Sequence, residues 1–157
     1  MRNIHDIFQD RTCYKFSSKA IPRDLLEKIY TDTALGPTSG NSSPLRLVFV
    51  ESVPEKKKLL DCLMEGNIET SETAPVIVLF AYDEKFYEKM DFLNPYGKAL
   101  QNMFADSEKL AKDTAERNSS LQAAYFMLAA RGYGLACGPM SGFNKNQLEE
   151  KFFRGTG

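Results

Sequence analysis

The feature that most limits the possible folds of this chain is a ten-residue segment, residues 121–130, that would make a helix apolar on every side. It is the second half of a stretch, residues 106–131, whose composition predicts one long helix. A helix without a polar face is buried in a core or lies in a subunit interface. The match of Ser119 and Gln122 to a capping box leaves open a break near Asn118, with a new helix starting at Ser119.

The rest of the chain alternates helical patterns with short apolar runs, and turn-forming residues mark most boundaries. Pro22, Pro54 and Asn144 stand where helices should begin, because proline fits the first turn and asparagine caps free N–H groups. The run 75–82 is apolar throughout, which is typical of a central strand covered on both faces. Further helices are predicted at residues 3–10, 22–34, 54–65 and 145–153, strands at 47–50, 75–82 and 135–140, and helix ends at Gly36, Gly66-Asn67 and Gly134.

Composition excludes several classes of function. The net charge of −1 over 157 residues favours neither nucleic acid nor an anionic membrane. No apolar run approaches the roughly 20 residues of a membrane span, and residues 1–6 lack a signal-peptide core, so we expect a cytoplasmic protein of one domain, residues 1–157. The single histidine, His5, and three cysteines without a C-x-x-C pair argue against a Ser-His-Asp triad and a metal site. If the chain is an enzyme, a bound organic cofactor should carry the chemistry.

Two segments could bind a polar ligand. Residues 36–44 (GPTSGNSSP) are nearly all turn formers, and such a bend exposes backbone N–H groups and short hydroxyls to a planar ligand such as a nucleobase or flavin. Arg11 and Lys15 flank small polar residues directly after the first helix, where they could bind an oxyanion. The alternatives stay open: a plain helix-to-strand connection for the first segment, and a solvated basic loop for the second.

A third bend, residues 138–143 (GPMSGF), offers further backbone N–H groups. Neither G-x-G-x-x-G nor G-x-x-x-x-G-K-[ST] occurs, so the chain has no dinucleotide fingerprint and no P-loop. The aromatic residues of segment 86–96 could line a pocket or lid, or could equally be satellite packing under a long loop.

Taken in order, these segments resemble the flavin-dependent nitroreductase family over essentially the whole chain. The branch that they resemble most is the one of malonic semialdehyde reductase and NAD(P)H nitroreductase. The motifs that carry the resemblance are residues 11–16 (RTCYKF), 36–44 (GPTSGNSSP), 66–67 (GN), 118–125 (NSSLQAAY) and 137–143 (CGPMSGF).

The resemblance implies an α+β nitroreductase fold, with a central mixed or antiparallel sheet flanked by helices, in an intertwined homodimer with FMN at the subunit interface. Arg11 and Lys15 would meet the FMN phosphate and ring edge, and a bend N–H would face the reactive flavin nitrogen. Cys13 stands where the family usually has Ser. The loop around Ser39 would reach the flavin from the other subunit. The implied cofactor-binding residues are Arg11, Thr12, Cys13, Lys15, Pro37, Thr38, Ser39, Asn41, Asn67, Asn118, Pro139, Met140, Ser141 and Gly142.

The implied function is hydride transfer from NADH or NADPH, through FMN, to a nitroaromatic, quinone or small aldehyde acceptor. No side chain is then an obligatory acid or base, and no metal is expected. Family members continue beyond the point that corresponds to residue 157 with a further strand and a C-terminal arm. This motivates an alternative, a non-catalytic flavin-binding or truncated nitroreductase-like protein. A structural domain that binds nothing is the remaining alternative.

Overall fold

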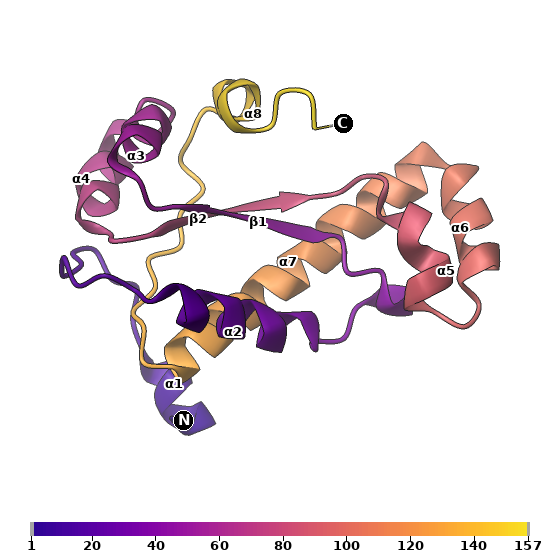
Figure 1. Ribbon diagram of the computed structural model, residues 1–157, viewed down its shortest axis with the longest axis horizontal. Coiled ribbons are helices and arrows are strands. Elements are labelled where there is room, and N and C mark those ends of the chain that lie inside the picture. The colour runs from indigo at the N-terminus through magenta and orange to yellow at the C-terminus, as the bar shows by residue number, and fades with distance from the viewer. Residues whose placement is uncertain (1, 157) are drawn as a thin grey trace.

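The computed structural model describes residues 2–156 as helices around a small sheet (Figure 1). Polar caps start several helices: Asn144, as expected from the sequence, and also Asn3 and Ser52 each accept a backbone N–H in the first turn. The elements are α1 (Ile4–Gln9), α2 (Arg23–Ala34), η1 (Ser39–Asn41), β1 (Leu45–Val50), α3 (Val53–Leu60), α4 (Glu65–Thr73), β2 (Ile77–Tyr82), η2 (Phe86–Lys89), α5 (Met90–Leu93), α6 (Gly97–Ala105), α7 (Glu108–Gly132) and α8 (Lys145–Phe152).

Helix α7 is the longest element and contacts α1, α2, α6 and both strands. It is continuous, so the alternative of a second start at Ser119 is wrong. The physical reason is that the Gln122 side chain makes a long-range contact instead of a local cap: its Oε1 accepts the backbone N–H of Leu45 at 3.0 Å. Ser107 caps the helix instead, and Gly134, with φ of +84°, follows its end as expected.

Strands β1 and β2 pair antiparallel, from Leu45 opposite Tyr82 to Val50 opposite Ile77. Figure 1 shows α2 and α7 on one side of this pair and α3, α4 and α8 on the other. The sheet of the described residues is therefore antiparallel and two-stranded, not mixed. Helices do cover both faces of β2, but Phe80 is still 43% exposed.

Two expected elements differ from the structure. Residues 135–140 are not a strand: the segment has no ladder partner among the described residues, and Pro139 has no N–H to give to one. Gly66 and Asn67 do not close α3, which ends at Leu60; they lie in the first turns of α4. Helix α4 lacks a regular apolar stripe, which explains why the sequence pattern did not indicate it.

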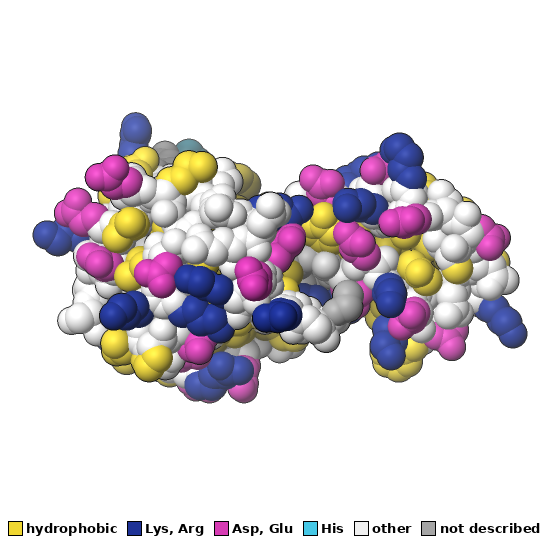
Figure 2. Space-filling model, turned by 90° about the horizontal axis from the view of Figure 1, so that it is seen from above, with side chains coloured by type: hydrophobic (Ala, Val, Ile, Leu, Met, Phe, Trp, Pro, Cys, Tyr) yellow, Lys and Arg dark blue, Asp and Glu magenta, His cyan; other side chains and the backbone are white. Residues whose placement is uncertain are grey.

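The core of the described part of the chain contains three clusters of buried side chains. One lies between the sheet and α3, α4 and α8, and one between the sheet, α2 and α7. The third is centred on Phe86, Met90 and Phe104, where η2, α5 and α6 meet the first half of α7. Figure 2 shows this third region as a lobe joined to the larger body by a narrower waist. Within residues 2–156, no helix has the length and apolar character that crossing a membrane requires.

Candidate functional site

The basic corner, residues 11–16, is held by backbone hydrogen bonds rather than by its charges. The N–H of Cys13 donates to the carbonyl of Cys137 at 3.0 Å, and the N–H of Phe16 donates to Oγ1 of Thr73 at 3.0 Å. Arg11 and Lys15 are exposed, and their side chains make no hydrogen bond or ion pair within residues 2–156. The fold thus fixes the backbone of this corner and leaves two cations available to an anion.

The C-terminal bend, residues 137–143, packs directly against this corner. A side chain at Gly138 would come within 2.5 Å of the Cys13 carbonyl oxygen, so only glycine permits the approach. The carbonyl of Gly142 accepts two hydrogen bonds at 2.9 Å, from Nδ2 of Asn67 and from the N–H of Met64. Asn67 therefore positions the bend through its Nδ2. We call residues 11–16, residues 137–143 and Asn67 together the corner cluster.

Backbone N–H groups of the bend are left without acceptors. The N–H of Met140, Ser141 and Gly142 makes no hydrogen bond among the described residues, whereas that of Phe143 donates to the Ser141 carbonyl at 3.1 Å. Pro139 and Ser141 are exposed, and the sulfur of Met140 lies 3.7 Å from the hydroxyl of Ser71. The bend thus presents donors beside two cations, which is an arrangement suited to an anionic or carbonyl-rich ligand.

The polar loop, residues 36–44, is held to α7 and α5 at several points. Oδ1 of buried Asn118 accepts the N–H of Ser39 at 2.8 Å, and the Tyr125 hydroxyl donates to the Pro37 carbonyl at 3.0 Å. The Asn41 amide donates to Leu93, and Oγ1 of Thr38 accepts the N–H of Ser43. Positive φ angles occur at Gly40, Asn41 and Ser43. Non-glycine residues such as Asn41 and Ser43 rarely adopt such angles. The hydrogen bonds that anchor the loop therefore hold these two residues in an unfavourable conformation.

The predicted site residues thus form two groups in one chain. The corner cluster holds Arg11, Thr12, Cys13, Lys15, Asn67, Pro139, Met140, Ser141 and Gly142, whereas Pro37, Thr38, Ser39, Asn41 and Asn118 form a loop cluster. Figure 1 shows η1 of the loop cluster beside α5, toward the opposite end of the sheet from the connection between α1 and α2 that carries the corner. No hydrogen bond joins the two clusters within residues 2–156.

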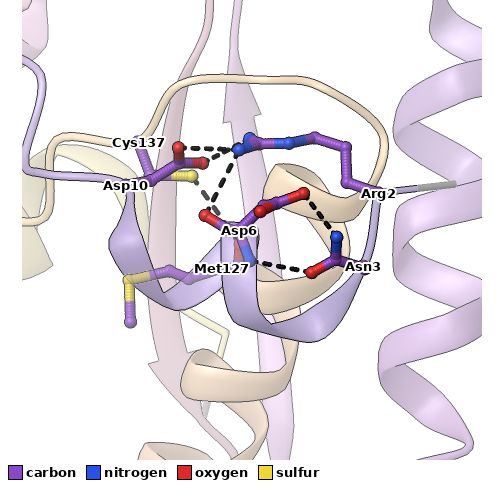
Figure 3. Close-up of polar contacts among 6 residues, drawn as sticks. All are labelled: Arg2, Asn3, Asp6, Asp10, Met127 and Cys137. Carbon is purple, nitrogen blue, oxygen red and sulfur yellow. Dashed lines mark hydrogen bonds and ion pairs between the residues drawn. The ribbon is translucent and has the colours of Figure 1, made fainter.

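The sequence analysis did not predict the polar contacts around helix α1, which directly precedes the basic corner. Nη2 of Arg2 lies 2.9 Å from Oδ1 of Asp10 and 3.2 Å from the Asp6 carbonyl, and Asn3 caps the helix between them (Figure 3). The Arg2 guanidinium holds the pKa of Asp10 below its usual range. Burial raises the pKa of the nearby Cys137 thiol, which lies near the Met127 carbonyl. Only the spacing of Arg2 and Asp10 around a short helix could have indicated the pair.

An apolar pocket of about 390 Å³ lies next to β2, and it reaches the surface, since exposed Phe80, Ala136 and Pro139 are among its lining residues. Its walls come from β2, residues 135–140, and helices on both sides of the sheet. Phe16 and residues 137–140 of the corner cluster line it, whereas Arg11 and Lys15 do not. Within residues 2–156, no group of three His, Cys, Asp or Glu side chains is placed to hold a metal ion.

Comparison with known proteins identifies the family of this chain. The model of the nitroreductase family matches residues 7–154, and the chain belongs to that family. A protein of Stutzerimonas stutzeri (strain A1501), provisionally named NADH dehydrogenase/NAD(P)H nitroreductase, is 48% identical over 146 residues, which are 93% of this chain and 74% of the relative.

Solved structures show the same fold. A structure from Exiguobacterium sibiricum 255-15, provisionally named a nitroreductase and solved in complex with FMN, matches with a TM-score of 0.87 at 22% identity, covering 98% of this chain and 81% of that one. A structure from Staphylococcus epidermidis ATCC 12228, provisionally named NAD(P)H:FMN oxidoreductase, matches with a TM-score of 0.80 at 23% identity, covering 96% and 78%. The nitroreductase fold expected from the sequence is therefore confirmed.

Proposed function

We propose that this chain is an FMN-dependent oxidoreductase that uses NADH or NADPH and reduces a nitroaromatic, quinone or small aldehyde. Family membership and the names of the relatives support the reaction class, and the FMN complex of the Exiguobacterium sibiricum protein supports the cofactor. The observation that carries the proposal for this chain is the junction of the basic corner with the C-terminal bend. Two cations without an ion-pair partner among residues 2–156 meet there with backbone N–H groups that have no acceptor in the same range.

The corner fits the phosphate end of FMN. The Arg11 guanidinium presents a planar fork of donors that matches a phosphate, and Lys15 adds a compact positive charge. Neither cation is neutralised by a carboxylate among the described residues. Thr12 adds a hydroxyl beside them, and Cys13 adds a thiol, which is a weaker hydrogen-bonding group.

The bend fits the ring end. When bound, FMN supplies hydride transfer between NAD(P)H and the acceptor. The N–H groups of residues 140–142 would hold the polar edge of the ring in place without adding a side-chain acid. Pro139 and Met140 would cover one ring face with apolar surface. The protein's part is thus positioning and electrostatics, and no side chain of the site needs to gain or lose a proton.

We further propose that two copies of the chain complete the site, because one chain keeps its corner and loop clusters apart. Helix α7 carries the surface that would pair: Leu121 is 44% exposed, and most residues from 123 to 129 are only half-buried although they are apolar. In such a dimer, Ser39 and Asn41 of one subunit would approach the flavin held by Arg11 of the other. Asn118 would act indirectly, by holding the Ser39 backbone.

The test starts with titration of the purified protein with FMN, followed by flavin fluorescence. Arg11→Ala should raise the FMN Kd by about tenfold or more, because a charge-assisted hydrogen bond contributes about 1.5–3 kcal/mol. Arg117→Ala is the matched control, since Arg117 is an exposed arginine on α7 outside both clusters.

NADH and NADPH are then added to the FMN complex without oxygen. Bleaching of the flavin absorbance supports an oxidoreductase and shows which nucleotide it prefers. Flavin that binds and never bleaches would instead indicate a non-catalytic flavin-binding protein. A chain that binds no FMN at all would contradict the proposal.

A further inference from the structure

Two of the three cysteines lie next to each other where the basic corner meets the C-terminal bend. The N–H of Cys13 donates to the Cys137 carbonyl at 3.0 Å. Standard bond lengths on both sides of this hydrogen bond keep the two Cα atoms less than about 7 Å apart, which is the range in which a disulfide can form. The fold thus pairs two cysteines that no C-x-x-C motif connects.

The backbones of the two segments are fixed at this distance. A Cβ on Gly138 would come within 2.5 Å of the Cys13 carbonyl oxygen, so the N–H and the C=O of Cys13 both face the bend. The N–H of Phe16 donates to Oγ1 of Thr73 and holds the other end of the corner. The approach that a disulfide needs is therefore present in the folded backbone and requires no loop to close.

Neither thiol is held strongly in its present position. Sγ of Cys13 donates to the Lys15 carbonyl at 3.2 Å, and Sγ of Cys137 lies 3.9 Å from the Met127 carbonyl oxygen (Figure 3). A thiol is a weak hydrogen-bond donor, so little is lost when either side chain rotates toward the other.

The electrostatics of Cys137 also indicate that the two sulfur atoms are near each other. Burial is the largest cause of the raised pKa of Cys137, and the Arg131 guanidinium opposes that rise. The negative charges of Asp10 and of an ionised Cys13 add to it. An effect of the Cys13 charge on Cys137 requires the two groups to be close in space.

A small oxidant can reach both members of this pair. Cys13 is partly exposed and stands between Arg11 and Lys15, and reactive cysteines typically lie in partly exposed, electropositive surroundings. Cys137 is also partly exposed, and it lines the pocket next to β2 that reaches the surface. Cys62, in contrast, is 1% exposed in the core between the sheet and α3, α4 and α8. Oxidation is therefore expected at the pair and not at Cys62.

We propose that Cys13 and Cys137 form a reversible disulfide when the protein meets hydrogen peroxide. In the first step the Cys13 sulfur attacks the peroxide, the O–O bond breaks, and Cys13 becomes a sulfenic acid as one water molecule leaves. In the second step the Cys137 sulfur attacks the Cys13 sulfur, the S–O bond breaks, the S–S bond forms, and another water molecule leaves. The two thiols are oxidised by two electrons, and one peroxide is reduced to two water molecules.

The disulfide couples the redox state of the pair to ligand binding at the corner. This part rests on the proposed function, because the cross-linked segments are those that we propose to hold FMN. In the dithiol form, the Cys13 thiol bonds to the Lys15 carbonyl and shapes the turn that carries the Lys15 cation. The disulfide removes that donor, so the Kd for FMN should rise by about threefold or more.

The test treats the purified full chain with hydrogen peroxide, with and without added FMN, and then alkylates the remaining thiols in urea before trypsin digestion. Mass spectrometry should find peptide 12–15 linked to peptide 132–145, whereas Cys62 in peptide 59–85 should be alkylated. The oxidised protein should migrate as a single chain on a non-reducing gel, and dithiothreitol should restore both thiols.

Variants of the three cysteines supply the second readout. In Cys137→Ser, the oxidised Cys13 has no partner, so its sulfenic acid should persist and react with dimedone. Cys13→Ser should give neither a linked peptide pair nor a dimedone adduct. Cys62→Ala is the matched control, and it should form the same linked pair as the wild type.

The outcomes separate the disulfide from the proposed cofactor. Absence of the linked pair in the wild type, a pair that includes Cys62, or a link between two chains would overturn the proposal. An equal Kd for FMN in the dithiol and disulfide forms would overturn the coupling to ligand binding. Failure of both forms to bind FMN would contradict the proposed function, whereas the linked peptides would still establish the disulfide.

Discussion

The side-chain Oδ1 of Asn118 accepts a hydrogen bond from the backbone N–H of Ser39 at 2.8 Å, across 79 positions of the sequence. Asn118 is 1% exposed, and its Nδ2 donates to the Thr114 carbonyl one turn earlier in α7. One buried amide therefore holds the polar loop to the longest helix. The loop owes its shape to this anchor and not to its glycines alone.

Replacing Asn118 with alanine should lower the free energy of unfolding by about 0.5–1.5 kcal/mol, because the hydrogen bond from the N–H of Ser39, an exposed residue, to the buried Asn118 side chain is lost. Asn118→Asp keeps an acceptor for that N–H and should recover part of the loss. Urea titration of the three proteins measures the difference. Equal stability of the wild type and the alanine variant would show that water replaces the amide.

The close approach of Gly36 to Tyr125 gives a second test. A Cβ built on Gly36 lies 2.6 Å from Cε2 of the Tyr125 ring, so Gly36→Ala should cost about 1–3 kcal/mol by overpacking. Combining it with Tyr125→Ala should remove most of that penalty, which a double-mutant cycle will measure. Gly66→Ala is the control: a Cβ there meets nothing within 4 Å, and the change should stabilise α4 by about 0.4–1 kcal/mol. Similar losses at both glycines would be inconsistent with this packing.

The Arg2–Asp10 pair should make stability depend on acid pH. Because Arg2 lowers the pKa of Asp10 in the folded state, the carboxylate contributes stability above its ordinary pKa of 3.8, and this contribution is lost as pH falls through the lower folded value. Asp10→Asn should therefore be less stable than the wild type at neutral pH, and the gap should narrow below about pH 4. Urea midpoints from pH 7 to 2.5 check this. A gap that is the same at pH 7 and pH 2.5 would contradict this role of the ion pair.

A charge placed on the exposed apolar side of α7 should weaken the proposed pairing of two subunits. Leu121→Lys should raise the Kd for self-association by about 10–150-fold, because burial of a leucine contributes about 1.5–3 kcal/mol. Light scattering after size-exclusion chromatography measures the oligomeric state. Ser120→Lys, at an exposed neighbouring position, is the control. A wild-type protein that stays monomeric at all concentrations would contradict the dimer itself.

Local chemistry was enough to predict much of the fold. Prolines and an asparagine marked the starts of α2, α3 and α8, and the apolar runs marked both strands. Helix α4 was missed because its sequence, EGNIETSET, has no apolar periodicity. Residues 135–140 were expected to be a strand because they are rich in apolar residues. Whether such a run becomes a strand depends on a hydrogen-bonding partner, which is a long-range property.

The segments of the candidate site could be predicted from the sequence, but the contacts that bring these segments together could not. The basic corner and the C-terminal bend each have recognisable residue types, but their contact through Cys13 and Cys137 joins positions 124 apart, and no spacing rule indicates it. The role of Asn118 in ligand binding stays a prediction; in the structure its Oδ1 accepts the Ser39 N–H. Gln122 matched a local cap and instead bonds β1. A buried amide on an apolar helix could have signalled such tertiary use, because it needs a partner.

The separation of the corner and loop clusters within one chain has a consequence for handling the protein. If each flavin is held by parts of two molecules, the fraction of protein with bound FMN depends on the protein concentration. Dilution would separate the subunits and release flavin even at constant free FMN. A sample purified at low concentration would then be pale, and concentrating it with added FMN would restore its yellow colour.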